Sequence, residues 1–230
     1  MEPISLGQQM SVITPAHFIP LVDEQQKLQL LAQSLELIEI EVFSFCNRKC
    51  DFCPNSIIDR HSVNIYMPEE HYLNILNQLR DINYSKALTF SRYNEPLSDP
   101  IIIERVRQAR EFLPNATLLT YTNGDYLSPA LISDLKDAGL NDLRIMVYPS
   151  QKMEHNAKIY QKLVAQKEEK TGLSFEWEYG PVAEGASKRS KLDGMNLSIS
   201  VFNLDRYGVN RGSLVQVESE YQRHSPCHIP

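Results

Sequence analysis

The chain has 230 residues, of which 42% are hydrophobic and 23% are charged, and this composition is typical of a soluble globular protein. Its formal net charge of −6 provides no excess of cations for a nucleic-acid backbone or an anionic membrane. The apolar runs are far shorter than the roughly 20 residues that span a bilayer, and no basic segment followed by an apolar one opens the chain. We therefore expect a cytoplasmic protein without nucleic-acid or membrane partners.

Residues 1–35 are predicted to be an N-terminal extension that carries one short helix. Pro3, Pro15 and Pro20 favour an irregular start, and Asp23 is a suitable N-cap for an amphipathic helix over residues 24–32. No side chain of this segment suggests chemistry. We expect the helix to cover one end of the domain that follows.

Residues 36–215 are predicted to form one α/β domain, because strand-like and helix-like patterns alternate along them. Period-two runs predict strands at residues 38–45, 86–91, 117–122, 142–148, 173–179 and 196–203. Apolar residues at helical spacing and capping or proline signals at the start predict helices at 68–79, 100–112 and 129–138, and residues 154–170 are predicted to form a polar helix. Helices between successive strands predict a parallel sheet with right-handed crossovers. Residues 180–195 lack an apolar stripe and are predicted to be a loop.

Three cysteines, Cys46, Cys50 and Cys53, lie within eight residues at the carboxyl end of the first predicted strand. Parallel α/β folds place their functional sites at that end of the strands, and the polar residues between the cysteines favour a metal site over a packing role. A structural zinc ion needs a fourth ligand, for which His61 and the distant Cys227 are candidates. An iron–sulfur cluster held by three thiolates instead keeps one iron open to another ligand. A non-catalytic zinc-binding module is therefore the alternative from a different functional class.

The Cys-x3-Cys-x2-Cys spacing, with Phe52 directly before the last cysteine, resembles the signature of the radical S-adenosylmethionine (SAM) superfamily. The resemblance implies that Cys46, Cys50 and Cys53 hold a 4Fe-4S cluster whose open iron binds the amino and carboxylate groups of SAM. It also implies that Phe52 lies against the adenine. The fold that it implies is a partial six-stranded parallel (β/α)6 barrel with the strands inside and the helices outside.

A turn after the second predicted strand extends the resemblance. Glu95-Pro96-Leu97 is similar to the end of a Gly-Gly-Glu-Pro-like turn, which in the family binds the methionine ammonium group of SAM. Tyr93 and Asn94 stand where the family has glycines, and asparagine tolerates positive φ, so we expect Asn94 to preserve the turn. The resemblance implies that Asn94 and Glu95 contact SAM. The missing glycines leave open a member that binds SAM without cleaving it.

Two further strand ends are expected beside SAM. Thr122-Asn123-Gly124 resembles a family turn at the end of the third strand, which implies a place for Asn123 next to the cofactor. Tyr148 or Ser150, after the fourth strand, would contact the ribose.

The fifth predicted strand alternates two glutamates with two aromatic residues. We expect Phe175 and Trp177 to face the barrel interior rather than Glu176 and Glu178, because burying a carboxylate is costly.

The resemblance implies an enzyme that cleaves SAM reductively to a 5′-deoxyadenosyl radical, which then removes a hydrogen atom from the substrate. Flavodoxin or ferredoxin would supply the electron. Residues 216–230 contain Cys227 in a Cys-x-x-Pro sequence that resembles the start of a SPASM or twitch extension, and we expect this extension to have been truncated. That branch favours a ribosomally synthesised peptide as substrate. Dehydrogenation or epimerisation of a sugar or aminoglycoside is the alternative.

Overall fold

The computed structural model describes residues 23–149, 153–182 and 185–202, which fall into two units divided after Leu35. In the first unit, helix α2 (Glu24–Ser34) begins after Asp23, whose carboxylate accepts a hydrogen bond from the Gln26 N–H at 2.7 Å. The predicted N-cap and helix are thereby confirmed. The first 22 residues of the predicted extension lie outside the described residues.

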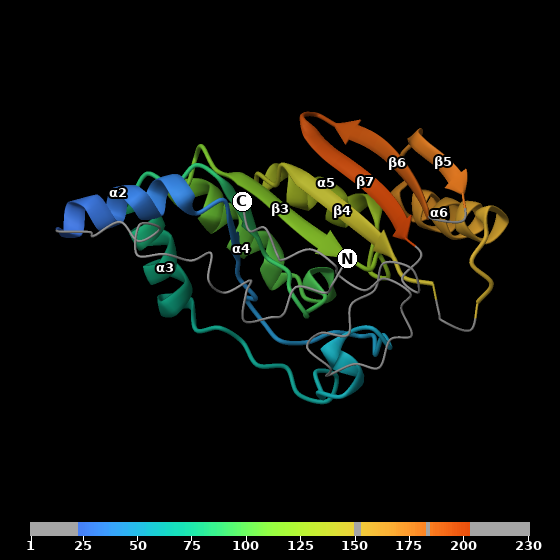
Figure 1. The fold of residues 1–230 in the computed structure, drawn as a ribbon, viewed down its shortest axis with the longest axis horizontal. Coiled ribbons are helices and arrows are strands. Elements are labelled where there is room, and N and C mark those ends of the chain that lie inside the picture. Colours follow the sequence, from blue (N-terminus) through green and yellow to red (C-terminus); the bar gives the residue numbers. More distant parts are fainter. Residues whose placement is uncertain (1–22, 150–152, 183–184, 203–230) are drawn as a thin grey trace, which may run out of the picture. The chain divides into compact units, whose positions relative to one another are not determined.

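The second unit is built on a mixed sheet in which, over the described residues, seven strands lie in the order β1-β2-β3-β4-β7-β6-β5 (Figure 1). The strands are β1 (Leu37–Glu39), β2 (Ala87–Thr89), β3 (Thr117–Thr122), β4 (Asp142–Val147), β5 (Glu176–Val182), β6 (Gly185–Leu192) and β7 (Met195–Phe202). Strands β1 to β4 pair in parallel, and β7 runs parallel to β4. The hairpin of β6 and β7 and the pairing of β5 with β6 are antiparallel.

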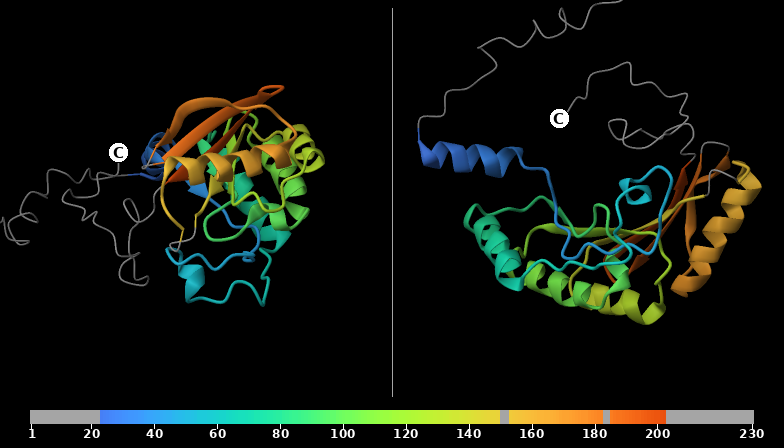
Figure 2. Two further views of the ribbon diagram at one scale, coloured as in Figure 1. Left: turned by 90° about the vertical axis from the view of Figure 1, so that its right-hand side faces the viewer. Right: turned by 90° about the horizontal axis from the view of Figure 1, so that it is seen from below.

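The helices of the second unit lie along one face of this sheet (Figure 2). They are α3 (Glu69–Asp81), α4 (Ile101–Phe112), α5 (Pro129–Asp137) and α6 (Ala157–Thr171), with short 3-10 helices η3 (Pro54–Ser56) and η4 (Pro96–Ser98) in the connections. None of the helices in the described ranges is long and apolar enough to cross a membrane.

The core lies between the sheet and these helices, as β4 illustrates. Leu143, Ile145 and Val147 are buried, whereas the alternate residues Arg144 and Met146 line the opposite face. Each fully buried aliphatic side chain contributes about 1.5–3 kcal/mol, so the apolar alternation determines which face the helices cover. The opposite, more polar face is left for a site.

The predicted α/β class is confirmed, and each predicted strand and helix overlaps an observed one. The sheet is mostly parallel, as predicted for β1 to β4 and β7, but β5 and β6 pair antiparallel, and among the described residues no helix separates β5 from the next strand. The predicted loop at residues 180–195 is wrong, because β6 and the turn to β7 occupy most of it. Strand β6 has no apolar stripe since its long cationic side chains are used instead: Lys188 pairs with Glu168 of α6 at 2.5 Å. Asp193 and Gly194, both with positive φ, form the turn, and an Asp-Gly pair is a strong hairpin signal in a sequence.

Arg110 of α4 joins the loops at the amino ends of β3 and β4. Its guanidinium group donates hydrogen bonds of 2.8–3.2 Å to the carbonyl oxygens of Leu113, Pro114, Ala116 and Gly139. We expect Arg110→Ala to lower the free energy of unfolding by about 3 kcal/mol, because partly buried carbonyl groups lose their donor. Urea denaturation checks this. Arg107 is an exposed residue of the same helix, and Arg107→Ala should change the free energy of unfolding by less than about 0.5 kcal/mol. Equal losses of stability in the two variants would contradict the expectation.

Candidate functional site

The three cysteines lie in the long connection between β1 and α3. All three are free thiols of intermediate exposure, and they line a cavity of about 340 Å³. The other predicted site residues, Phe52, Asn94, Glu95, Asn123 and Tyr148, line the same cavity. These residues come from the segments that follow four parallel strands, β1 to β4. The structure thus brings these eight residues together, and their roles as ligands remain predictions.

The cysteine loop is shaped by its own backbone hydrogen bonds. The N–H of Cys46 donates to the carbonyl oxygen of Arg60 at 3.0 Å, and the N–H of Cys53 donates to that of Cys50 at 2.9 Å. Burial raises the pKa of the Cys46 thiol, and it raises the pKa of the Cys50 thiol to about 11 although Arg48 opposes the shift. Both thiols are therefore protonated at neutral pH when no metal is bound, and metal binding must release their protons.

The raised pKa of Cys50 predicts slow alkylation of the metal-free protein. At pH 8 we expect iodoacetamide to modify Cys50 far more slowly than it modifies glutathione, because the thiolate is the nucleophile. The rate should rise about tenfold per pH unit and level off only near pH 11. Peptide mass spectrometry at several pH values measures this rate for each cysteine. A rate that levels off below pH 9 would contradict the expectation.

The turn at residues 91–95 is held by Glu41, a residue that the sequence patterns did not single out. Glu41 Oε1 accepts hydrogen bonds from the N–H groups of Tyr93 at 2.5 Å and Asn94 at 2.7 Å, and Glu41 Oε2 pairs with Arg60 at 2.6 Å. The Asn94 side chain accepts from the N–H of Arg92 and donates to the carbonyl oxygen of Phe90. These bonds close the turn without a left-handed residue.

Asn94 therefore holds the turn through its side-chain hydrogen bonds and not through a positive φ. Among the described non-glycine residues, Asn83 and Asp193 are the ones with positive φ. The sequence held one signal for the role of Glu41, since a glutamate flanked by Ile40 and Val42 at a strand end needs a polar partner.

Glu95 is 2% exposed and connects the turn after β2 to the turn after β3. Its carboxylate accepts hydrogen bonds from Thr122 Oγ1 at 2.6 Å, the Asn123 N–H at 2.7 Å and the Leu97 N–H at 3.1 Å. Burial raises the pKa of Glu95, although these hydrogen bonds oppose the shift. Glu95 Oε2 accepts the hydrogen bond from the Asn123 N–H, and a carboxylate oxygen can accept a second one. It can therefore also accept a hydrogen bond from a ligand in the cavity.

Asn123 and Gly124 give the turn after β3 its shape. Asn123 Nδ2 donates to Asn47 Oδ1 at 2.8 Å, which links this turn to the cysteine loop. Gly124 has φ of +71°, and a Cβ atom there would lie 2.9 Å from the side chains of Ile145 and Leu127. Glycine is required on both counts.

Phe52 and Tyr148 form an aromatic wall of the cavity, with ring centroids 5.1 Å apart. Burial raises the pKa of Tyr148, and the neighbouring Cys50 and Glu95 raise it further. Tyr148 is therefore a neutral phenol at physiological pH. The other ribose candidate, Ser150, lies outside the described residues.

The proposed fourth zinc ligands receive no support from the described residues. The His61 ring stacks on Phe45 with centroids 5.5 Å apart, and its Nδ1 lies 3.4 Å from the carbonyl oxygen of Cys46. Within the part of the chain that the structure describes, no three Cys, His, Asp or Glu side chains are grouped to hold a single metal ion. Cys227 lies outside that part.

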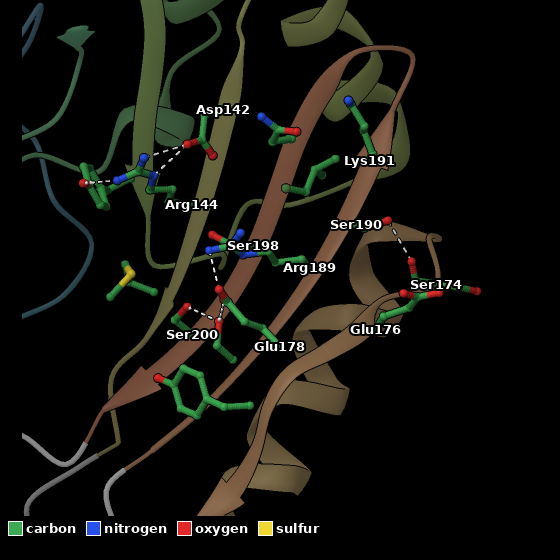
Figure 3. Close-up of a pocket in the computed structure, with 16 residues that line it drawn as sticks. Asp142, Arg144, Ser174, Glu176, Glu178, Arg189, Ser190, Lys191, Ser198 and Ser200 are labelled. Atoms are coloured by element: carbon green, nitrogen blue, oxygen red, sulfur yellow. Dashed lines mark hydrogen bonds and ion pairs between the residues drawn. The ribbon is translucent and has the colours of Figure 1, made fainter.

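A second and larger cavity, of about 940 Å³, lies on the polar face of the sheet (Figure 3). It shares Tyr121 and Met146 with the first cavity. Arg144 of β4 is held there by Asp142 at 2.8 Å and by the Tyr121 hydroxyl group at 2.8 Å. Serine hydroxyl groups from β6 and β7 line the same wall, and those of Ser187 and Ser200 lie 3.0 Å apart.

The expectation for the fifth strand is wrong, because the glutamates and not the aromatic residues face this cavity. Glu176 and Glu178 both line it, and Glu178 pairs with Arg189 (Figure 3). Phe175 is buried, and Trp177 is 41% exposed. Both carboxylates remain exposed there, so the cost of burying a carboxylate, on which the expectation was based, does not arise.

Comparison with known proteins identifies this arrangement. Residues 40–151 match the sequence model of the Radical SAM superfamily. The S-adenosyl-L-methionine-dependent 2-deoxy-scyllo-inosamine dehydrogenase of Niallia circulans is 30% identical over 134 residues, which cover 58% of this chain and 53% of that protein. This chain therefore spans about half the length of that curated relative.

Two solved structures give similar matches. The crystal structure of BtrN in complex with AdoMet and 2-DOIA is 29% identical, with 59% of this chain and 54% of that chain covered and a TM-score of 0.46. Selenomethionine BtrN in an open conformation is 30% identical, with coverages of 49% and 50% and a TM-score of 0.45. Residues 40–151, which contain the three clustered thiols, therefore form a domain of the radical SAM superfamily, whose enzymes use a 4Fe-4S cluster and SAM as cofactors.

Proposed function

We propose that this chain is a radical SAM dehydrogenase that oxidises a secondary alcohol of a polyhydroxylated ring, such as an aminocyclitol or amino sugar, to a ketone. The relative from Niallia circulans, which is named a dehydrogenase of 2-deoxy-scyllo-inosamine, supports this reading over peptide modification. The observation that carries it is the large cavity beside the cysteine cavity, lined by hydroxyl, carboxylate and guanidinium groups. Such a wall suits a ligand with many hydroxyl and amino groups.

The proposed reaction consumes one SAM for each ketone formed. Alcohol and SAM give ketone, 5′-deoxyadenosine, methionine and one proton, so atoms, charge and electrons balance. The carbon-bound hydrogen of the alcohol moves to 5′-deoxyadenosine, and the hydroxyl hydrogen leaves as the proton. When bound, the reduced cluster and SAM supply the radical chemistry that breaks the carbon–hydrogen bond.

The residues of the smaller cavity divide into two proposed roles. The free, half-buried thiols of Cys46, Cys50 and Cys53 fit a cluster, since thiolates are the ligands that iron–sulfur clusters take. Asn94, Glu95 and Asn123 offer polar groups to the amino-acid part of SAM.

On the other wall of this cavity, the aromatic rings of Phe52 and Tyr148 offer apolar surface to the adenosine part.

The cluster needs a one-electron donor, and we propose a reduced flavodoxin or ferredoxin for this step. Exposed iron–sulfur centres and free thiols persist in reducing compartments, which supports a cytoplasmic location.

The test uses the full chain, reconstituted with iron and sulfide without oxygen and supplied with dithionite and SAM. Cyclic amino alcohols deuterated at the carbinol carbon should give deuterium in 5′-deoxyadenosine and a ketone that can be trapped as an oxime, in equal amounts. Peptide substrates should give neither product. Deuterium transfer from peptides alone, or transfer with no ketone, would contradict the proposal.

Arg144 provides a sharper test, because it lines the proposed substrate cavity and bonds Tyr121, which the two cavities share. We expect Arg144→Met to raise the KM for the ring compound at least about tenfold, the usual effect of losing a charge-assisted hydrogen bond. Arg107→Met, an exposed arginine on α4, is the matched control and should leave KM unchanged. An unchanged KM in Arg144→Met would place the substrate elsewhere.

A further inference from the structure

We propose that Asp125 is a positioning residue for the cluster-binding loop, which it holds through Asn47 and Arg48. This inference rests on the proposed function only in taking Cys46 and Cys50 as cluster ligands. Asp125 directly follows the turn after β3 and is far from the cysteines in the sequence.

Arg48 makes the strongest of these contacts. Its Nε and Nη2 atoms each lie 2.6 Å from a different carboxylate oxygen of Asp125, a bidentate pair. Asn47 Nδ2 adds a hydrogen bond of 3.0 Å to the same carboxylate. Bidentate guanidinium–carboxylate pairs fix orientation as well as distance, so the loop is held in one rotational position.

A second set of cations holds Asp125 itself. Lys167 of α6, whose side chain is 10% exposed, donates to the carboxylate at 2.9 Å, and Lys170 donates to the Asp125 carbonyl oxygen at 2.9 Å. The pair of Arg48 and Asp125 is itself about three-quarters buried, with side-chain exposures of 27% and 29%. Solvent therefore screens these contacts less than it screens a surface pair.

The contacts of Asp125 are important because of where Asn47 and Arg48 lie in the chain. Asn47 and Arg48 are two of the three residues between Cys46 and Cys50, so fixing them fixes how these two thiols face the cavity. Asn123 strengthens the connection, because its side chain bonds Asn47 and its N–H bonds Glu95. Asn123 thus connects the loop that carries the cysteines to the turn that carries Glu95, and the Asp125 N–H donates to Asn123 Oδ1 at 2.9 Å.

The test has a readout that needs no catalysis. In the metal-free protein, trypsin can cleave after Lys49, which is exposed, only as fast as the loop opens locally. We expect Asp125→Asn, which keeps the size of the side chain, to accelerate this cleavage at least about tenfold. Asp137→Asn, an exposed aspartate paired with Lys136, is the matched control and should leave the rate unchanged.

A second readout uses the reconstituted protein. Iron release to a chelator should also be at least about tenfold faster in Asp125→Asn. Arg48→Met should accelerate both the cleavage after Lys49 and the iron release, while it leaves the pair of Asp125 and Lys167 in place. This variant replaces Asp125→Asn in the test if Asp125→Asn does not fold.

Unchanged rates in either folded variant would overturn the inference. Equal acceleration of cleavage at all tryptic sites would also overturn it, because it would indicate a general structural role. Since cleavage of the metal-free protein is independent of substrate, a failure of the proposed dehydrogenation leaves this result unaffected.

Discussion

Replacing Cys50 by alanine is expected to reduce the iron bound by the reconstituted protein from roughly four per chain to nearly none, and to abolish cleavage of SAM. Cys50 lies between the other two thiols in the sequence, and it lines the cavity with both of them. A cubane with two protein ligands would have two open irons, and it would be lost or degraded. Iron and sulfide analysis, with the visible absorption of the cluster, measures the effect, and 5′-deoxyadenosine formation measures cleavage.

Cys227→Ala is the matched control for this experiment, because it removes the fourth cysteine of the chain. The control should keep its iron and its cleavage activity. Iron retained in Cys50→Ala would contradict the assignment of the ligands. Loss of metal in Cys227→Ala, or a colourless protein with one bound zinc, would instead favour the alternative of a zinc site closed by Cys227.

Glu95→Gln is expected to weaken SAM binding at least about tenfold and to slow SAM cleavage by more than that. The Glu95 carboxylate accepts a hydrogen bond from the Asn123 N–H at 2.7 Å. Glutamine has the same size, but its NH₂ group would place a second donor against this N–H, and the hydrogen bond would be lost. The substitution also removes the negative charge that we propose for the ammonium group of SAM. Two effects of about 1–3 kcal/mol each would then act in the same direction.

Equilibrium binding of SAM to the reconstituted protein measures this effect, and urea denaturation shows how much of it is a loss of stability. Glu36→Gln is the control, since Glu36 is an exposed carboxylate paired with Lys86. Wild-type affinity in Glu95→Gln would show that Glu95 serves only to join the two turns. A loss of stability with affinity retained would lead to the same conclusion.

The local patterns of the sequence were sufficient to find the loop of three cysteines and most of the fold. Three thiols at a fixed spacing can be recognised without a structure, because ligands of one centre that lie within eight residues are brought together by the loop itself. Strands β4 and β7 alternate buried with more exposed residues, so their period could be read directly. Strand β6 could not be recognised from its sequence, because its cationic side chains find their partners only on helix α6 and strand β5.

The tertiary structure decided how that loop is held and what lies beside it. Glu41 and Asp125 carry no motif, and the structure identifies their partners: two N–H groups of the turn after β2 for Glu41, and Arg48 with Lys167 for Asp125. The direction of the glutamates on β5 likewise depended on Arg189 of the neighbouring strand.

The sequence by itself therefore determined the chemistry that this chain can hold, namely three thiols placed after the first strand of an α/β fold. The structure decided the geometry of the site and the polar cavity next to it. The physical reason is the range of the interactions: cluster ligands and hydrophobic periodicity act between residues close in the chain, whereas ion pairs and buried hydrogen bonds join residues that are up to about 80 positions apart and meet only in the folded protein.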